Sequence, residues 1–203
     1  MTHVAAPRAR MQRPERRAAI IDGAAAAFAR GGYSATSMAD VAAATGVSHL
    51  IVYRHFDSKD ALYEAVLDRA LDLLAAALSD ERAIGSHGPT PAMLLGAARA
   101  DRTAFEVLWR HAAREPGFAR FADRARGLLR TATEVALAPH VAPEHLRWAA
   151  RATSAYVVEA VLVWVEDGAP RYDARFVAAT NAALKAGVRS WAKIVVSEAN
   201  DGT

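Results

Sequence analysis

The sequence predicts an all-α protein: a three-helix helix-turn-helix domain at the N-terminal end, joined to a larger helical domain, with about nine helices in all. Three observations lead to this prediction. Apolar residues recur at three- and four-residue spacing along most of the 203 positions. Alanine is abundant, whereas runs typical of strands are scarce. Two short helical patterns also flank a glycine between Ser37 and Lys59.

The N-terminal segment divides into an arm and a first helix. Residues 1–12 combine mixed charges with no apolar period, which predicts a disordered basic arm. The same arm could instead reach a minor groove or phosphates when DNA is present. From Pro14 to Arg30 a helix is expected, with one apolar face formed by Ile20, Ala24 and Phe28.

The next stretch carries the signals of two helices around a tight turn. Ser37 followed by Asp40 is a helix-start pattern, because a short side-chain oxygen accepts the free N–H groups of the first turn and an acid there faces the positive helix end. Gly46 supplies the permissive backbone of the turn, and Ser48 can cap the second helix. Two such helices, the second ending in an aromatic and basic cluster, are typical of a helix-turn-helix that lays its second helix in a DNA major groove.

The run GVSHLIVYRHFDSKDALY, from Gly46 to Tyr63, is the most specific part of this pattern. It combines a turn glycine, a Tyr in the second helix, a Phe at its end and a Lys at the start of the next helix. With these residues the chain resembles TetR-family transcriptional regulators over about residues 14–75. The resemblance implies a DNA-binding domain at residues 13–60 and a ligand-binding and dimerisation domain at residues 61–203.

The same resemblance implies a function. A member of this family is a homodimeric, ligand-responsive DNA-binding regulator, most often a repressor of transcription. A small apolar or aromatic effector would release it from a palindromic operator of double-stranded DNA.

DNA contacts are carried over from the family onto nine residues. His49 is the polar candidate for base reading, because Leu50 and Ile51 can only contact thymine methyl groups or sense DNA shape. For both Leu50 and Ile51 the alternative is partial burial against the domain's own core, and for Ile51 the two alternatives are about equal. Tyr53 and His55 match positions that hold the DNA backbone, which orients the protein rather than reading sequence. The predicted contacts are Thr36, Ser37, Ser48, His49, Leu50, Ile51, Tyr53, His55 and Lys59.

The excess positive charge lies in the same part of the chain. The net charge is +3, and the first 60 residues hold eight Lys or Arg against five Asp or Glu, whereas the remainder balances at seventeen of each. Neutralisation of DNA phosphates requires such a distribution. A solvated leader rich in arginine would give the same count.

The helices expected after the DNA-binding domain contain many aromatic residues. In the family the corresponding helices enclose the effector cavity, and aromatic side chains suit an apolar or aromatic ligand. Plain core packing is an equal alternative for each of them. The candidate pocket residues are Met93, Phe105, Trp109, Phe118, Phe121 and Tyr156.

Wide apolar stripes run along the last two expected helices, Pro143–Glu166 and Asp173–Val196. In the family, two such helices from each subunit form a four-helix dimer interface. The alternative is that both helices only cover the subunit's own core. The candidate interface residues are Val157, Ala160, Val161, Trp164, Ala179, Ala183, Leu184, Gly187, Val188 and Trp191.

Several classes of site and function are not expected. The chain contains no cysteine, which excludes disulfides and thiolate metal sites. His111 and Glu115 have the spacing of a metal pair, but no third ligand follows at helical spacing, so neither a metal nor another cofactor is expected. No Gly-rich phosphate loop, GxSxG turn or His and acid constellation indicates an enzyme. Without a signal-peptide core or an apolar run that could span a bilayer, the expected location is the cytoplasm.

A second functional class stays open at this stage. Because Leu50 and Ile51 carry no hydrogen-bonding group, the chain could be an effector-binding or protein-interaction module with weak sequence readout. The sequence identifies neither the operator nor the effector, and it does not decide between repression and activation.

Overall fold

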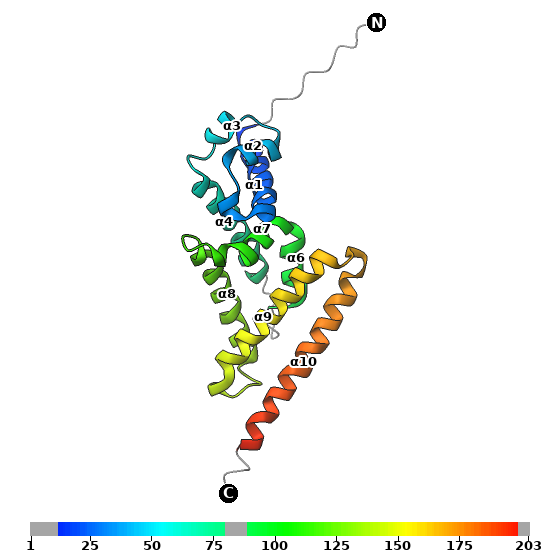
Figure 1. Cartoon of the computed structure of the whole chain (residues 1–203). Coiled ribbons are helices and arrows are strands. Elements are labelled where there is room, and N and C mark those ends of the chain that lie inside the picture. The colour runs from blue at the N-terminus through cyan, green and yellow to red at the C-terminus, as the bar shows by residue number, and fades with distance from the viewer. Residues whose placement is uncertain (1–11, 80–88, 199–203) are drawn as a thin grey trace. The chain divides into compact units, whose positions relative to one another are not determined.

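The structure is a computed structural model that describes residues 12–79 and 89–198. Within these ranges the chain forms nine α-helices, one π-helical turn and two 3-10 turns, with no strand (Figure 1), so the all-α prediction is confirmed. The chain divides into two compact units, one ending at Val66 and the next beginning at Leu67. The domain bounds expected from the sequence, 13–60 and 61–203, stay a prediction. The predicted N-terminal arm lies outside the described residues, except for Gln12.

The first unit is a small helical bundle. Its elements are α1 (Arg13–Ala35), α2 (Met38–Thr45), α3 (His49–Tyr53) and the first two turns of α4 (Lys59–Ser79). Helix α1 begins where the sequence predicts, because Pro14 lies in its first turn and the Gln12 N–H donates to the Glu15 carboxylate at 3.0 Å. The bundle's core consists of side chains that are almost fully buried: Ile20, Ala24, Phe28, Val41, Val52, Phe56, Leu62 and Tyr63.

The turn between α2 and α3 has the local geometry that the sequence predicts. Ser37 is the N-cap of α2, and its hydroxyl accepts a hydrogen bond from the Asp40 N–H at 3.2 Å. In return, the Ser37 N–H donates to the Asp40 carboxylate at 2.8 Å. Gly46 ends α2 in the left-handed conformation at φ 65°, which a side chain would strain. These contacts set where α3 begins relative to α2.

The second unit contains the rest of α4 and the following helices. They are α6 (Pro91–Ala100), α7 (Arg102–Glu106), the π-turn η2 (Val107–His111), η3 (Ala112–Arg114), α8 (Ala119–Leu137), α9 (Pro143–Asp167), η4 (Pro170–Tyr172) and α10 (Asp173–Glu198). The segment from Asp101 to Arg114 is not one regular helix, because it passes from α-helix through the π-turn to a 3-10 turn.

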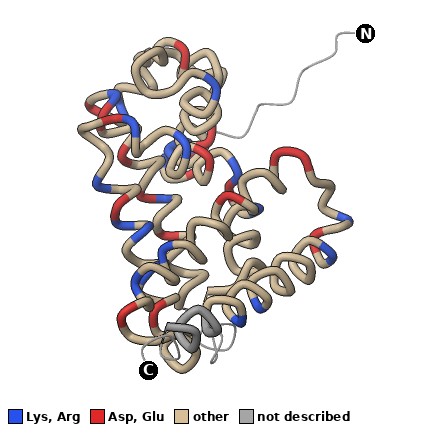
Figure 2. Tube along the Cα trace, turned by 60° about the horizontal axis from the view of Figure 1, so that its bottom comes forward, with Lys and Arg blue, Asp and Glu red and all other residues tan. Residues whose placement is uncertain are grey.

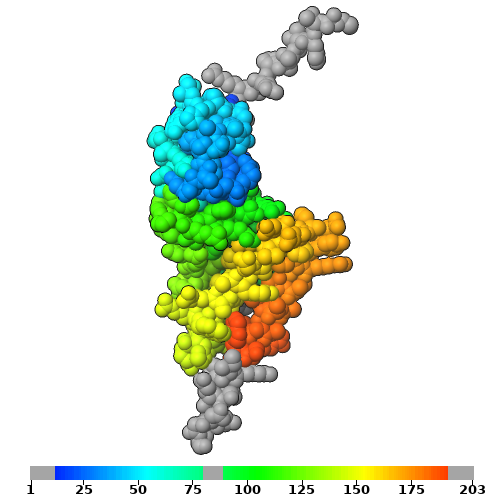
Figure 3. All heavy atoms as spheres, in the orientation of Figure 1, coloured from blue at the N-terminus to red at the C-terminus, as the bar shows by residue number. Residues whose placement is uncertain are grey.

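Helix α9 is the centre of the second unit, since α6, α8 and α10 all pack against it. Helices α9 and α10 lie side by side as an antiparallel pair, yellow and orange in Figure 3. At one end of the pair the rings of Trp164 and Phe176 stack at 4.9 Å. At the other end Trp191 packs on a buried cluster that includes Ala149 and Ala150. Helix α10 is therefore attached to α9 at both ends.

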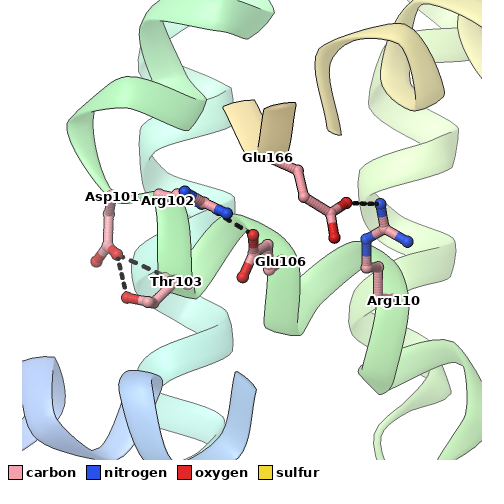
Figure 4. A network of polar contacts seen from close by, with 7 residues as sticks. Asp101, Arg102, Thr103, Glu106, Arg110 and Glu166 are labelled. Atoms are coloured by element: carbon pink, nitrogen blue, oxygen red, sulfur yellow. Dashed lines mark hydrogen bonds and ion pairs between the residues drawn. The ribbon is translucent and has the colours of Figure 1, made fainter. Parts of the chain in front are cut away.

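Polar contacts hold the α7–η2 segment in place, as Figure 4 shows. Asp101 caps α7 by accepting from the Ala104 N–H at 3.0 Å, and its other oxygen lies 2.8 Å from Nε of Arg69 on α4. Arg110 of the π-turn donates to Glu166 of α9 at 2.8 Å. The segment is thus tied to both α4 and α9.

None of the helices in the described ranges is long and apolar enough to cross a membrane.

Candidate nucleic-acid interface and ligand groove

Helix α3 presents three side chains away from the core of the first unit. His49 is exposed, Leu50 is 63% exposed and Tyr53 is 44% exposed. The rings of His49 and Tyr53 meet edge to face with centroids 4.7 Å apart, which fixes both on the same side of the helix. Val52 is fully buried on the opposite side and anchors the helix. The result is a short ridge with one polar ring, one aliphatic chain and one phenol.

The open question about the two aliphatic residues has separate answers for each. Leu50 points to solvent, so nothing in its own unit covers it. Ile51 is half-buried, as the alternative of partial core packing predicts. Leu50 is therefore the aliphatic side chain available to a partner, with Ile51 behind it.

The start of α1 places arginines beside the end of α3. Partial burial, together with the positive charges of Arg13, Arg16 and Arg17, lowers the pKa of His55 below its ordinary value of 6.5. The Arg17 guanidinium also lies over the Phe56 ring at 4.8 Å. His55 is accordingly neutral at pH 7, at the edge of a basic patch formed by the α1 arginines (Lys and Arg are blue in Figure 2). The sequence prediction omitted these three arginines, although their clustering at a helix start was the available signal.

The remaining predicted DNA contacts differ in how freely they can meet a phosphate. Ser48 is exposed at the N-cap of α3, and its hydroxyl makes no capping bond there. Ser37 is exposed, but its hydroxyl also donates to Asp40 at 2.6 Å, and this bond is the largest cause of the lowered pKa of Asp40. Lys59 is half-buried: its ammonium group donates to the Tyr33 carbonyl at 3.0 Å and lies 4.1 Å from the centre of that ring. A phosphate bound at Lys59 would share the ammonium group with the Tyr33 carbonyl.

Thr36 does not fit its predicted role. Its side chain is 5% exposed, and its hydroxyl donates to the Gly32 carbonyl at 2.7 Å. Gly32 has φ 72° and interrupts the regular helix of α1. The Thr36 hydroxyl therefore satisfies a carbonyl near the end of this helix. We therefore remove Thr36 from the candidate DNA contacts.

The structure places the predicted effector-pocket residues at different sites in the second unit. A groove of about 1310 Å³ lies between α8 and α9, and of the six candidates only Trp109 lines it. Tyr156 is 45% exposed and lines a second hollow, between α9 and α10. The other four candidates are between 2% and 8% exposed and line neither hollow, so they are core residues: Met93, Phe105, Phe118 and Phe121.

The predicted interface residues also separate into three groups. Val157 and Val161 are 3% and 0% exposed within one subunit, so they belong to the subunit's own core and leave the candidate interface. Ala179 and Ala183 are exposed on α10. The other six lie half-buried along α9 and α10: Ala160, Trp164, Leu184, Gly187, Val188 and Trp191. Of these, Val188 and Trp191 pack on the buried cluster of their own subunit.

The geometry of the first unit defines a helix-turn-helix DNA-binding domain: a capped helix, a left-handed glycine turn, and a second helix with an exposed ridge beside a basic patch. A sequence model of the family described as "Bacterial regulatory proteins, tetR family" matches residues 20–66, which include this whole motif.

Known proteins agree with this assignment. The transcriptional repressor Rv3405c of Mycobacterium tuberculosis is 45% identical over 83 residues, 37% of this chain and 44% of the repressor. The transcriptional activator FasR of Mycolicibacterium smegmatis is 42% identical over 67 residues, 33% of this chain and 31% of the activator. The chain thus spans less than half the length of these curated relatives.

Likeness over nearly the whole chain comes from a solved structure. A TetR-like transcriptional regulator from Rhodococcus sp. RHA1 has a TM-score of 0.65 at 22% identity, covering 93% of this chain and 99% of that one. The resemblance to the TetR family is therefore confirmed for the N-terminal part of the chain, because the family model matches residues 20–66, and the chain has the fold of a TetR-like regulator.

Proposed function

We propose that this chain is a DNA-binding transcriptional regulator that binds a palindromic operator as a homodimer and leaves it when a small ligand occupies the second unit, which makes it a repressor. The observation that carries the DNA-binding part is the exposed ridge of His49, Leu50 and Tyr53 on a helix whose other side is anchored in a core. A rigid helix with a free ridge is the arrangement that major-groove reading requires.

In this proposal, different residues read the bases and bind the phosphates. His49 can donate to or accept from a base edge, and Leu50 can pack on a thymine methyl group. Tyr53 and Ser48 can hold phosphates through their hydroxyl groups, and the arginines at the start of α1 add charge that attracts DNA without reading its sequence. This assignment makes His49 and Leu50 the residues on which operator preference depends.

Dimerisation is proposed through the outer faces of α9 and α10. Ala179 and Ala183 are exposed and small, so a second pair of helices can approach them closely. Tyr156 and Val163, each 45% exposed, extend this face onto α9. A dimer would present two copies of α3 to half-sites roughly 34–36 Å apart, one turn of DNA.

The alternative function is an effector-binding or protein-interaction module that binds DNA with weak sequence readout. It is favoured by one observation: His49 is the single hydrogen-bonding side chain among the three residues that follow Ser48. Such a module would bind DNA mainly through its arginines, with a steep dependence on salt.

Fluorescence anisotropy decides between the two functions. Purified protein is titrated onto DNA from immediately upstream of its own gene, and onto sites selected from genomic DNA, with excess nonspecific competitor across a salt series. Saturable binding that survives competitor supports the regulator, and His49→Ala should then reduce the preference for the selected site over its variants. Selection that enriches no site, with binding lost to competitor at every salt concentration, would leave the alternative.

A further inference from the structure

The groove between α8 and α9 has an apolar floor and a charged rim. Its floor contains Leu129, Val158 and Leu162, which are 2%, 8% and 3% exposed, together with the half-buried ring of Trp109. At about 1310 Å³ the groove exceeds what most small ligands fill, so a bound molecule would occupy part of it and reach its rim.

Arginines recur on both walls. Arg126 and Arg130 lie four residues apart on α8, and Arg147 and Arg151 lie four apart on α9. Like charges at this spacing on one helix repel each other. On α8 the repulsion is offset, because Arg126 pairs with Asp123 at 3.1 Å and Arg130 pairs with Glu134 at 2.8 Å.

The arginines on α9 lack this compensation. Among the residues that the structure describes, neither Arg147 nor Arg151 makes an ion pair. Two rim acids, Glu144 and Glu159, also line the groove without an ion pair in the described part of the chain. An anion between Arg147 and Arg151 would remove the repulsion that these two guanidinium groups exert on each other.

The Trp109 ring at the groove is held by a π-helical turn. Trp109 lies in the π-turn η2, and π-turns recur at functional sites. The turn is held in place, because Arg110 is bonded to Glu166 and Asp101 to Arg69 (Figure 4 shows the first of these pairs). The indole Nε1 is buried from solvent, so the ring contributes apolar surface to the groove rather than a hydrogen-bond donor.

We propose that this groove binds an organic anion: an apolar body that packs on Leu129, Val158 and Leu162 beside the Trp109 ring, and an anionic head held by Arg147 and Arg151. This inference rests on the proposed function, because it names the class of ligand to which the regulator responds. It would place the ligand's charge on α9, the helix against which α6, α8 and α10 pack.

Isothermal titration calorimetry on the full chain without DNA tests the site by itself. The probes are 1-naphthaleneacetate and octanoate, the amide of each, and 1-(1-naphthyl)ethylamine as the cationic counterpart. Each acid is expected to bind about tenfold or more tightly than its amide, since charge-assisted hydrogen bonds are lost with the charge. Arg151→Gln and Arg147→Gln should each weaken the acids by ~10-fold and leave the amides unchanged.

Arg124→Gln is the matched control, because Arg124 is exposed on α8 and does not line the groove. It should bind all probes like the parent protein. Any one of four results would overturn the proposal. The acid and its amide could bind with equal affinity, or the amine could bind more tightly than the acids. Alternatively, neither acid could bind at millimolar concentration, or Arg151→Gln and Arg124→Gln could have equal effects.

A second measurement separates this inference from the proposed function. DNA-binding anisotropy is repeated with 1-naphthaleneacetate at saturation in the calorimetric assay. Calorimetric binding with unchanged DNA affinity would uphold the anion site and refute ligand control of the operator. DNA binding with no calorimetric signal from any acid would refute the anion site and leave operator binding standing.

Discussion

Replacing Gly23 by alanine should separate α1 from α2, and the structure gives the expected size of the effect. A Cβ at Gly23 would lie 2.1 Å from Cγ2 of Thr45, well inside the contact distance of two carbon atoms. The Thr45 methyl group cannot turn away freely, because its hydroxyl donates to the carbonyls of Val41 and Ala42 at 3.0 and 3.1 Å. Either the two helices shift or the threonine gives up these bonds.

Two opposing effects set the expected change in the free energy of unfolding. Overpacking of this kind costs about 1–3 kcal/mol in unfolding free energy. Alanine in place of glycine inside a helix returns about 1 kcal/mol. Gly23→Ala should therefore destabilise the first unit by about 0–2 kcal/mol. In a Thr45→Ser background the methyl group is gone and the hydroxyl stays, so the same change should stabilise by roughly 0.5–1 kcal/mol.

The assay is a double-mutant cycle read by native-state hydrogen exchange of α1 and α2 amides. Exchange is chosen because all four tryptophans lie beyond Leu67, so tryptophan fluorescence would follow the second unit instead. The coupling energy of the cycle should be about 1–3 kcal/mol, and operator affinity should fall in Gly23→Ala and recover in the double variant. A coupling energy below about 0.5 kcal/mol, or stabilisation by Gly23→Ala alone, would refute the close approach of the two helices.

Three further predictions concern pH and assembly. Because the folded pKa of His55 lies below 6.5, protonation of His55 favours the unfolded chain. The urea midpoint of the first unit should therefore fall between pH 7 and pH 5, and it should fall less in His55→Asn. An equal dependence of the urea midpoint on pH in the two proteins would contradict this. Hydrogen bonds from Arg99 and Trp164 lower the pKa of Asp173, so Asp173→Asn should cost about 0.5–1 kcal/mol at pH 7. That difference should vanish as the pH falls below 3.8 toward the folded pKa, and a difference independent of pH would count against the assignment. Ala183 is exposed on α10, so Ala183→Glu should give a monomer in sedimentation at micromolar concentration. The control Val135→Glu, at a position 74% exposed on α8, should leave a dimer. A dimer in both variants would reject the proposed interface.

Features set by neighbours in the sequence could be predicted well. The helix start at Ser37 and the stop at Gly46 depend on hydrogen bonds within three or four residues and on the backbone freedom of one glycine. The exposed ridge of α3 followed in the same way, since Val52 and Phe56 point inward at helical spacing and leave His49 and Tyr53 outside. Local patterns of this kind carry their own geometry.

Residues far apart in sequence decided the rest. Lys59 looks like a phosphate ligand until the fold brings it to Tyr33, whose carbonyl accepts a hydrogen bond from its ammonium group. Sequence spacing could not show that the π-turn would carry Trp109 to a groove with its N–H unpaired, because π-turns have no spacing signal of their own.

The sequence by itself determined the all-α class, the helix-turn-helix and the exposed face of its second helix, because caps, turns and periodicity act over one or two helical turns. It did not determine which side of a wide apolar stripe is interior. Val157 and Ala183 both lie on such stripes, yet one is buried in its own subunit and the other is exposed. Only tertiary packing made that choice, because burial depends on which other helices cover each face of α9 and α10.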